Sequence, residues 1–390
     1  MLQKCVRAAK FLLLYVAMAP VLLLLFLLRP FVLIRVGSLR TATFGHCALN
    51  IELYLCELDA GLHPSNAVDI FYHDRQVRNH QLAKMWSRGV RVHPFAYYLR
   101  FALDFWPGFG RHVINTHSRD RHGIFDGCKP HLSFSRQEVE TGRAALERLG
   151  VGRDPYICIN ARDSAYKKAI EPGLDWSYHD YNNMDVNAYV PAIESLARRG
   201  FYILRMGSVV GGAVASSDPR LIDYATNGMR TDFLDIYLPA GCRFFVSNGT
   251  GIDTVPKIFH RPVLYVNQIP LEYLYGECAH DLMIPKKLRM RDEDRFMGFR
   301  EIIESGVGRF LRTEQYEERD LEIIDNTPAE IEAATMEMLG RLEGTWKTTD
   351  EDEELQRRFW ALLSPSDDIN KVFRSRIGAQ FLRENRDLLG

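Results

Sequence analysis

The residues best suited to bind a ligand lie in the run Phe244-Phe-Val-Ser-Asn-Gly-Thr-Gly-Ile-Asp-Thr-Val-Pro-Lys-Ile-Phe. An apolar strand ends here, a turn of small and polar residues follows, and a helix begins. Glycines let the backbone approach an anion closely, and a helix N-terminus offers free N–H groups. The alternative is a tight turn in which Asp253 or Thr254 caps the helix. The pattern predicts a phosphate site formed by Ser247, Asn248, Gly249, Thr250 and Gly251.

Arginines follow two other predicted strands. Arg162 lies just after Tyr156–Asn160, and Arg205 ends Phe201–Arg205. Ligands of α/β proteins bind at the carboxyl ends of strands, and an arginine fork matches the geometry of a phosphate. We expect both arginines to neutralise a leaving diphosphate, in a pocket that also includes Asp163, Tyr166 and Gly207. The alternatives are a surface pair of Arg162 with Asp163, and a glycine turn beside a solvated Arg205.

The stretch Tyr178-His-Asp-Tyr-Asn-Asn-Met-Asp185 is rich in polar and aromatic side chains and precedes a predicted helix. Such side chains suit a pocket for a sugar or a base. Asp185 also suits the N-cap of the helix. We expect the pocket to include His179, Tyr181, Asn182 and Asp185.

His46 lies in Phe44-Gly-His46, at the start of the first helix after the first strand. Histidine titrates near neutral pH, so His46 is a candidate general base for an acceptor hydroxyl, facing a cleft between two domains. A structural histidine is the alternative. Glu57 and Asp59 are weaker candidates for the base.

The elements that position these residues alternate between strand and helix, which predicts parallel sheets. Expected strands are 31–36, 68–72, 90–93, 156–160, 201–205, 243–247 and 262–266. Expected helices are 46–58, 77–88, 135–149, 187–199, 231–240, 254–260 and 327–342, with 107–133 as loop. The fold class is therefore α/β, with two Rossmann-like domains facing a cleft. The expected divisions are a membrane segment (1–30), an N-terminal domain (31–150), a C-terminal domain (151–344) and a charged helical tail (345–390).

Composition excludes several classes of protein. The chain has 390 residues, 46% of them hydrophobic, and a net charge of -1, so it lacks the broad positive field that nucleic acid requires. The seven cysteines form no Cys-x-x-Cys pair, and no His-Glu-x-x-His occurs, so we expect no metal and buried thiols in a reducing compartment. There is no Walker A loop, Gly-x-Gly-x-x-Gly or Gly-x-Ser-x-Gly, so ATPases, dehydrogenases and serine hydrolases are disfavoured.

Residues 11–28 carry no charge and reach the length of a candidate transmembrane helix. Basic residues flank both ends, so the orientation stays open. A spanning anchor and a helix lying in the cytoplasmic interface both fit, whereas no cleavage site for a signal peptide follows. Each alternative predicts contact with a membrane. The sequon Asn248-Gly-Thr250 lies within the predicted phosphate turn, which favours a cytosolic setting without glycosylation.

With these residues in view, the chain resembles a family of bacterial glycosyltransferases linked to surface-polysaccharide synthesis. The resemblance covers about residues 31–340. It rests on Phe44-Gly-His46, Asn50-x-Glu52-x-Tyr54, Arg162-Asp-Ser-x-Tyr166, the 178–185 stretch, Arg205-Met-Gly207, and Ser247–Gly251 followed by Pro256, Phe259, Pro262 and Asn267. It implies a metal-independent enzyme of the two-domain GT-B fold, with the nucleotide-sugar in the C-terminal domain and the acceptor in the N-terminal domain. The paired-glutamate donor motif of better-known GT-B families is absent, which leaves the donor sugar and the stereochemistry open.

These observations together predict a glycosyltransferase at the cytoplasmic side of the inner membrane. It would use a nucleotide-sugar as co-substrate, without a further cofactor, and a glycan or lipid-linked acceptor. Another transferase on the same scaffold, moving a pyruvyl or glycerol-phosphate group, is one alternative. A non-catalytic, membrane-tethered carbohydrate-binding protein is the other.

Overall fold

The computed structural model describes residues 17–365 and 371–390. The chain forms two compact units. The N-terminal unit comprises residues up to Ser118 together with Cys128–Ser133, and the C-terminal unit comprises Arg119–Gly127 and Phe134–Gly390.

The C-terminal unit is built around a seven-stranded sheet in the order β12-β8-β7-β6-β3-β4-β5, and every neighbouring pair is parallel. The strands are β3 (Tyr156–Asn160), β4 (Tyr202–Arg205), β5 (Leu221–Ile222), β6 (Phe245–Ser247), β7 (Val263–Gln268), β8 (Leu282–Pro285) and β12 (Arg376–Ile377). The central strands are continuous apolar runs because both faces of a parallel sheet are covered. This sheet confirms the predicted α/β class.

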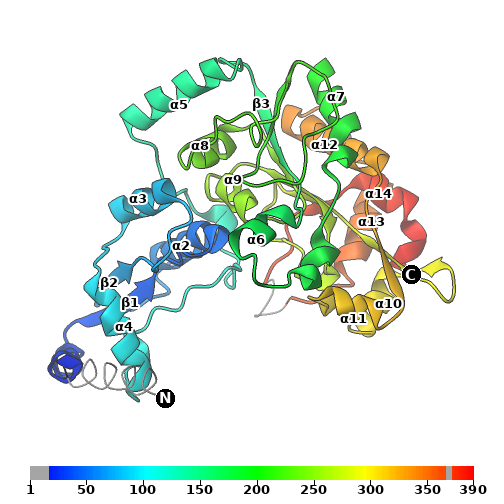
Figure 1. Cartoon of the computed structure of the whole chain (residues 1–390). Helices are drawn as coiled ribbons and strands as arrows, with labels where there is room; N and C mark the ends of the chain where they lie inside the picture. The colour runs from blue at the N-terminus through cyan, green and yellow to red at the C-terminus, as the bar shows by residue number, and fades with distance from the viewer. Residues whose placement is uncertain (1–16, 366–370) are drawn as a thin grey trace. The chain divides into compact units, whose positions relative to one another are not determined.

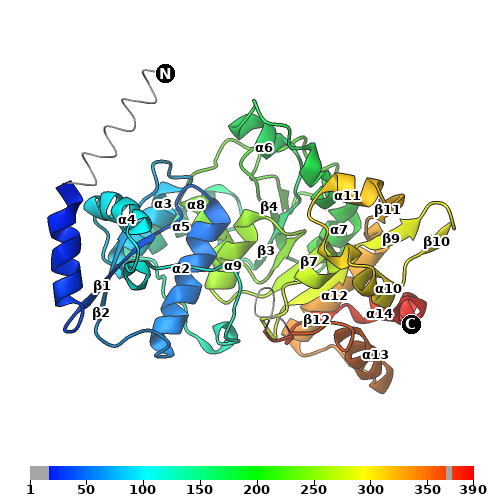
Figure 2. The same cartoon turned by 90° about the horizontal axis from the view of Figure 1, so that it is seen from below.

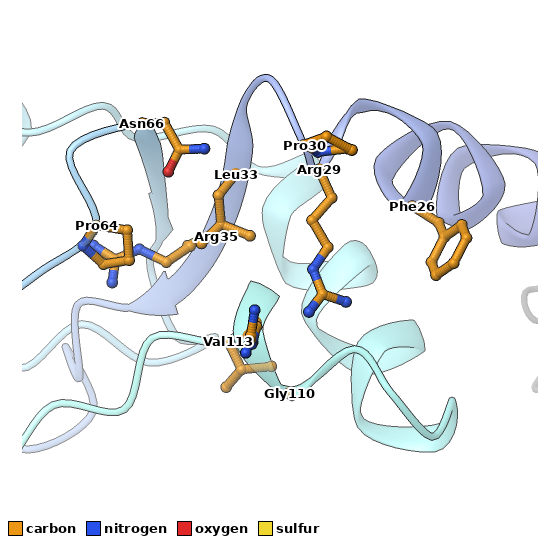
Figure 3. Close-up of a pocket in the computed structure, with 10 residues that line it drawn as sticks. Phe26, Arg29, Pro30, Leu33, Arg35, Pro64, Asn66, Gly110 and Val113 are labelled. Carbon is orange, nitrogen blue, oxygen red and sulfur yellow. The ribbon is translucent and has the colours of Figure 1, made fainter.

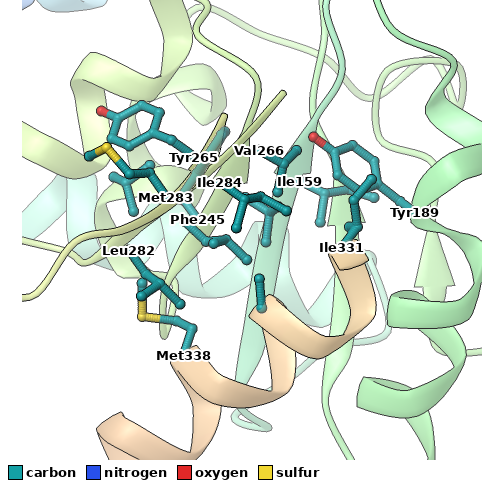
Figure 4. Packing of buried hydrophobic residues seen from close by; sticks show 14 of the residues in the cluster. Ile159, Tyr189, Phe245, Tyr265, Val266, Leu282, Met283, Ile284, Ile331 and Met338 are labelled. Atoms are coloured by element: carbon teal, nitrogen blue, oxygen red, sulfur yellow. The ribbon is translucent and has the colours of Figure 1, made fainter. Parts of the chain in front are cut away.

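Helices cover the two faces of this sheet. Figure 1 and Figure 2 show α7 (Val190–Arg198) and α12 (Pro328–Glu343) on one face, and α8 (Leu234–Gly241) and α9 (Thr254–Ile258) on the other. Met338 of α12 packs beside Leu282 of β8, and both side chains are almost completely buried (Figure 4). The predicted start of α12 is confirmed, since Thr327 and Glu330 form a capping box.

The rest of the C-terminal unit extends this core. A small antiparallel sheet has the order β10-β9-β11. Its strands are β9 (Lys287–Met290), β10 (Arg295–Phe296) and β11 (Leu321–Ile324), and the remaining α-helices are α5 (Arg136–Arg148), α6 (Ala165–Ile170), α10 (Phe299–Glu304), α11 (Thr313–Glu317), α13 (Asp350–Trp360) and α14 (Ala379–Glu384). The expected charged tail is therefore part of this unit, because β12 pairs with β8.

The N-terminal unit has a smaller sheet than a full Rossmann-like domain. Its two strands, β1 (Leu33–Ser38) and β2 (Ala67–Tyr72), are parallel. Single parallel bridges join Val36 to Val113 and Phe71 to Val92. The predicted strand 90–93 is thus reduced to one bridge. Its named helices are α2 (Phe44–Asp59), α3 (His80–Gly89) and α4 (Phe95–Phe105), and the sequence did not indicate α4.

The boundary between the units differs from the predicted one at residue 150. After the earlier stretch Arg119–Gly127, the chain returns to the C-terminal unit at Phe134, so α5 belongs to that unit. Phe134 stacks on Phe259 with ring centroids 5.3 Å apart. Further along α5, Gly142 faces the ring of Tyr237 in α8. These aromatic contacts tie α5 to the second unit, and helix periodicity alone does not reveal them.

The predicted membrane segment 11–28 lies partly outside the described residues, and its described part is helical over 17–28. Within residues 17–365 and 371–390, no helix is both long and apolar enough to cross a bilayer.

The contact between Gly142 and Tyr237 gives a prediction about stability. A Cβ atom on Gly142 would lie 2.1 Å from Tyr237 Cζ. Gly142→Ala is therefore expected to lower the free energy of unfolding by about 1–3 kcal/mol through overpacking, although alanine has the higher helix propensity. Urea denaturation measures this change. Gly89→Ala in α3 is the control, because a Cβ there meets no atom within 4 Å. A Gly142→Ala variant as stable as the control would contradict the packing.

Candidate functional site

The chain reverses its direction of travel across the large sheet between β3 and β6. From β3 it continues to β4 and β5, whereas from β6 it continues to β7 and β8 on the other side. β3 and β6 are themselves neighbours. The loops that follow them therefore part at their carboxyl ends, which is where open α/β sheets bind ligands. The two predicted ligand-binding motifs, after Asn160 and after Ser247, both lie at this point.

Hydrogen bonds from two asparagines join the predicted motifs. Thr250 Oγ1 donates to Asn160 Oδ1 at 2.8 Å. Asn248 Oδ1 accepts the backbone N–H of Arg162 at 2.8 Å, and Asn248 Nδ2 donates to the carbonyl of Asn182 at 2.8 Å. Three segments that are distant in sequence, 160–162, 182 and 248–250, thus meet in one place. That they form one ligand site stays a prediction.

Asp253 fills the turn that the sequence assigned to phosphate. Its Oδ2 accepts from Ser247 Oγ at 2.9 Å and from the Thr250 N–H at 2.6 Å, while the Gly249 N–H donates to Ser247 Oγ at 3.2 Å. Asp253 lies at the N-cap of α9 but makes no side-chain cap bond there, and instead closes a capping box with Thr250. Two N–H groups proposed for phosphate therefore have partners within the turn. Gly249 has a φ of 89°, which favours glycine. Burial raises the pKa of Asp253 to about 6.

Arg162 is half-buried, and unlike Arg205 its side chain has no ion-pair partner among the described residues. The expected alternative, a pair with Asp163, is not present. Asp163 instead accepts the backbone N–H groups of Ala165 and Gly211, each at 2.8 Å. Burial lowers the pKa of Arg162, and the electrostatic influence of Tyr181, Tyr275 and Asp180 opposes that effect. A partly desolvated cation that forms no direct ion pair is costly, and a bound anion would relieve that cost.

Aromatic rings gather close to Arg162. Tyr178 and His179 have ring centroids 4.1 Å apart, and His179 is near-parallel to Trp176, with an interplanar angle of 10°. Tyr181 lies 6.3 Å from His179. Burial, together with the charge of Arg162, lowers the pKa of His179 and favours its neutral form. Flat rings beside a cation suit the stacking of a base or a sugar.

One buried lysine, Lys286, holds the segment that carries these rings. Lys286 Nζ donates to the carbonyls of Tyr181 and Asn183, each at 3.0 Å, and pairs with Asp325 at 2.7 Å. Burial lowers the pKa of Lys286. Sequence reasoning missed this residue, because more than a hundred positions separate it from the segment that it holds. Asp185 accepts the Asn187 N–H at 2.9 Å, which confirms the predicted cap.

Arg205 has a different environment from Arg162. It is 1% exposed, pairs with Asp223 at 3.2 Å, and donates to the Gly212 carbonyl at 3.1 Å. The solvated alternative is therefore wrong, and a diphosphate would have to compete with Asp223. Gly207 follows at a φ of 158°, where a Cβ would lie 2.6 Å from Val210. Tyr166 lies in α6, half-buried.

Arg119 is a second basic residue that sequence reasoning missed, since it falls in the long loop 107–133. Its guanidinium carbon lies 4.4 Å from the ring centroid of Tyr275, and Nη2 donates to the Tyr273 carbonyl at 3.1 Å. Its Nη1 is buried and has no hydrogen-bond partner among the described residues. Tyr275 also interacts electrostatically with Arg162. Arg119 and Arg162 therefore both interact with Tyr275.

His46 belongs to the N-terminal unit and lies in the first turn of α2. Its Nδ1 is 3.2 Å from Asn50 Oδ1, and Asn50 Nδ2 donates to Thr116 Oγ1 at 3.4 Å. We assign the ring proton to Nδ1, because an amide oxygen only accepts, and this leaves the lone pair on Nε2. Burial lowers the pKa of His46, so the neutral base predominates at pH 7. That His46 faces a cleft stays a prediction.

No protein-family model and no curated protein matches the chain. Solved structures do align with it at low identity. A glycosyl transferase family 9 structure from Veillonella parvula aligns over 80% of this chain and 98% of its own, at 12% identity and a TM-score of 0.43. The E. coli ADP-heptose heptosyltransferase II aligns over 64% and 90%, at 12% identity and a TM-score of 0.40. An E. coli heptosyltransferase with ADP aligns over 65% and 91%, at 13% identity and a TM-score of 0.32.

The buried carboxylate of Asp253 gives a prediction about the turn. Asp253→Ala leaves the Ser247 hydroxyl and the Thr250 N–H without an acceptor, so it is expected to lower the free energy of unfolding by about 2–4 kcal/mol. Asp253→Asn keeps an acceptor oxygen and is expected to lose less than half as much. Urea denaturation of both variants measures the difference in their free energies of unfolding. Equal losses in the two variants would show that the hydrogen bonds are not what stabilises the turn.

Proposed function

We propose that this protein is a glycosyltransferase that moves a sugar from a nucleotide-sugar to a cell-surface glycan or lipid-linked acceptor. The C-terminal unit binds the donor at the carboxyl ends of β3 and β6, with the diphosphate on Arg162. The observation that carries the proposal is the partly desolvated Arg162 side chain, which forms no direct ion pair among the described residues and lies where the sheet reverses.

The chemistry follows from the charge that develops during transfer. The bond between the anomeric carbon and the diphosphate oxygen breaks, and the leaving nucleotide gains negative charge. The guanidinium of Arg162 stabilises that charge in a partly water-excluded site, where electrostatic effects are strong. This supplies the role that a metal ion fills in other transferases, so we include metal independence in the proposal. Arg119, near the same tyrosine, adds to the positive field.

The rings around His179 provide the rest of the donor pocket in this proposal. Stacking on an aromatic face holds a base or a sugar without fixing its identity. Asn182 and Asp185 add polar groups next to these rings. The hydroxyl of the acceptor must lose a proton as the new bond forms. In an inverting reaction, Nε2 of His46 is our candidate to take it.

The N-terminal unit supports a membrane-bound acceptor. The helix over 17–28 packs Met18, Leu22 and Leu25 into a cluster with residues of α4. Its other side remains apolar, with Leu23 60%, Leu27 60% and Phe31, just beyond the helix, 77% exposed. An apolar face of this kind suits a helix lying in the plane of a bilayer interface. We therefore place the enzyme on the cytoplasmic surface of the inner membrane.

A pocket lies next to this apolar face, within the N-terminal unit. It has a volume of about 740 Å³ and is lined by Phe26, Arg29, Arg111 and Asn66, among others. Figure 3 shows the side chain of Arg29 reaching from the end of the helix toward the pocket. Arginine beside an exposed apolar surface suits the phosphate of a lipid head group. The pocket is our candidate for the polar end of a lipid-linked acceptor.

The donor site predicts the effect of one substitution on nucleotide binding. Arg162→Ala removes charge-assisted hydrogen bonds to the diphosphate, and we expect about 10- to 100-fold weaker binding of the cognate nucleoside diphosphate. Isothermal titration of the purified chain with UDP, GDP, CDP and ADP measures this.

Arg291→Ala is the matched control, since Arg291 is 55% exposed and lies in the small antiparallel sheet region. It is expected to bind as the wild type does. Failure of the wild-type protein to bind any nucleotide would overturn the donor site. Binding without sugar transfer to any acceptor would instead favour the carbohydrate-binding alternative.

The apolar face predicts membrane binding. Replacing Leu23, Leu27 and Phe31 together by serine removes apolar groups that would enter the bilayer, each CH₂ contributing ~0.8 kcal/mol to membrane binding. Partitioning onto vesicles is therefore expected to fall at least about tenfold. Co-sedimentation with phosphatidylglycerol vesicles measures this. Leu62→Ser is the control, because Leu62 is also exposed in the same unit. Equal sedimentation of both variants would exclude this face as the contact.

A further inference from the structure

A cluster of potential metal ligands lies in the N-terminal unit, and the proposed function assigns no role to its members. Glu52, Cys56 and His131 each offer one ligand atom, and these atoms all lie within 4.8 Å of one another. Glu52 and Cys56 occupy positions i and i+4 on one side of α2, whereas His131 comes from 128–133. The 79 positions between Glu52 and His131 explain why no ligand spacing is visible in the sequence.

One oxygen of Glu52 makes the cluster incomplete as it stands. Oε1 accepts the backbone N–H of His131 at 3.1 Å and lies 3.0 Å from His131 Nδ1. Oε2 is buried and has no hydrogen-bond partner among the described residues. The side chain of Glu52 is 0% exposed, so solvent does not satisfy this oxygen. An unpaired carboxylate oxygen in such a site is costly unless a cation or a proton compensates it.

The second nitrogen of His131 has the partner that a metal-binding histidine commonly uses. Its Nε2 lies 3.2 Å from Asp59 Oδ2. A histidine that binds a metal through one nitrogen usually donates the other N–H to a carboxylate, which fixes the orientation of the ring. Asp59 is therefore a positioning residue in this arrangement, with Nδ1 directed toward Glu52.

We propose that Glu52, Cys56 and His131 bind a zinc ion. Carboxylate oxygen, thiolate sulfur and imidazole nitrogen are all accepted zinc ligands, at about 2.0–2.3 Å. The ligand atoms of a tetrahedral zinc site are about 3.5 Å apart. Side-chain rotations that move the ligand atoms by about an ångström would therefore form the site. One carboxylate and one thiolate balance the charge of the ion, and the thiol proton leaves on binding. These residues supply three of the four ligands of such a site.

A zinc ion here would hold the segment Cys128–Ser133 against α2. Cys128–Ser133 belongs to the N-terminal unit, although the segments before and after it belong to the other unit. The metal links this excursion to the long helix α2 through His131. The role is structural and is independent of the proposed donor site, so failure of one proposal leaves the other unaffected.

The experiment uses the full chain, purified without chelators or a histidine tag. We expect one zinc per chain by plasma mass spectrometry. After chelation, Co²⁺ is expected to restore the site with thiolate-to-metal charge-transfer absorption in the near ultraviolet. Cys56→Ser should abolish that absorption, and Asp59→Asn should weaken Co²⁺ binding by roughly tenfold or more.

Cys47→Ser is the matched control, because Cys47 is also a buried cysteine of α2 but is not in the cluster. Its zinc content and cobalt spectrum should equal those of the wild type. Wild-type protein that is folded, contains substoichiometric zinc and gives no charge-transfer absorption with Co²⁺ would overturn the proposal. The proposal would also be wrong if the charge-transfer absorption survived in Cys56→Ser and disappeared in Cys47→Ser.

Discussion

The structure of the C-terminal unit depends on one constraint, the need to satisfy polar groups where β3 and β6 part. Neighbouring strands whose loops turn away from each other leave backbone groups without ladder partners, and burial makes each such group costly. Asn160 and Asn248, 7% and 2% exposed, meet this need by joining the two loops to each other and to residue 182. The asparagines therefore serve the fold first, and in doing so they bring the candidate site together.

Within the candidate site, some polar groups have partners inside the protein and others do not, and this difference indicates where a ligand would bind. Asp253 provides acceptors inside the 247–251 turn, so the turn is stable on its own account. Arg162 receives no comparable partner from the described residues. Natural proteins seldom bury a charge without compensation, and exceptions concentrate at functional sites. The cation, rather than the glycine turn, is thus the stronger indication of an anionic ligand.

The sequence predicted what local chemistry determines. The strands at 156–160 and 243–247 are apolar runs, and the helices at 136 and 328 carry capping boxes, so their type and approximate bounds followed from neighbouring residues. Contacts between distant segments were not predictable in this way. Lys286, Arg119, the pairing of β12 with β8, and the approach of His131 to Glu52 each join positions far apart in the chain. The predicted boundary at residue 150 differs from the observed one at Phe134 for the same reason, because the contacts of α5 decide which unit it belongs to.

Arg162 and Arg205 show how far such reasoning extends. Each follows or ends a strand at the same edge of the sheet, and the sequence gives both the same expected role. In the fold, the loop after β5 brings Asp223 within 3.2 Å of Arg205, whereas Asp163 turns its carboxylate to two backbone N–H groups and leaves Arg162 unpaired. Removing one member of a buried ion pair strongly destabilises the folded protein. Arg205 is therefore needed as the partner of Asp223. An arginine with no such partner can exchange water for an anion at little structural cost. Both arginines are thus candidate anion ligands by their position at a strand end. The placement of nearby carboxylates favours Arg162 over Arg205 for that role.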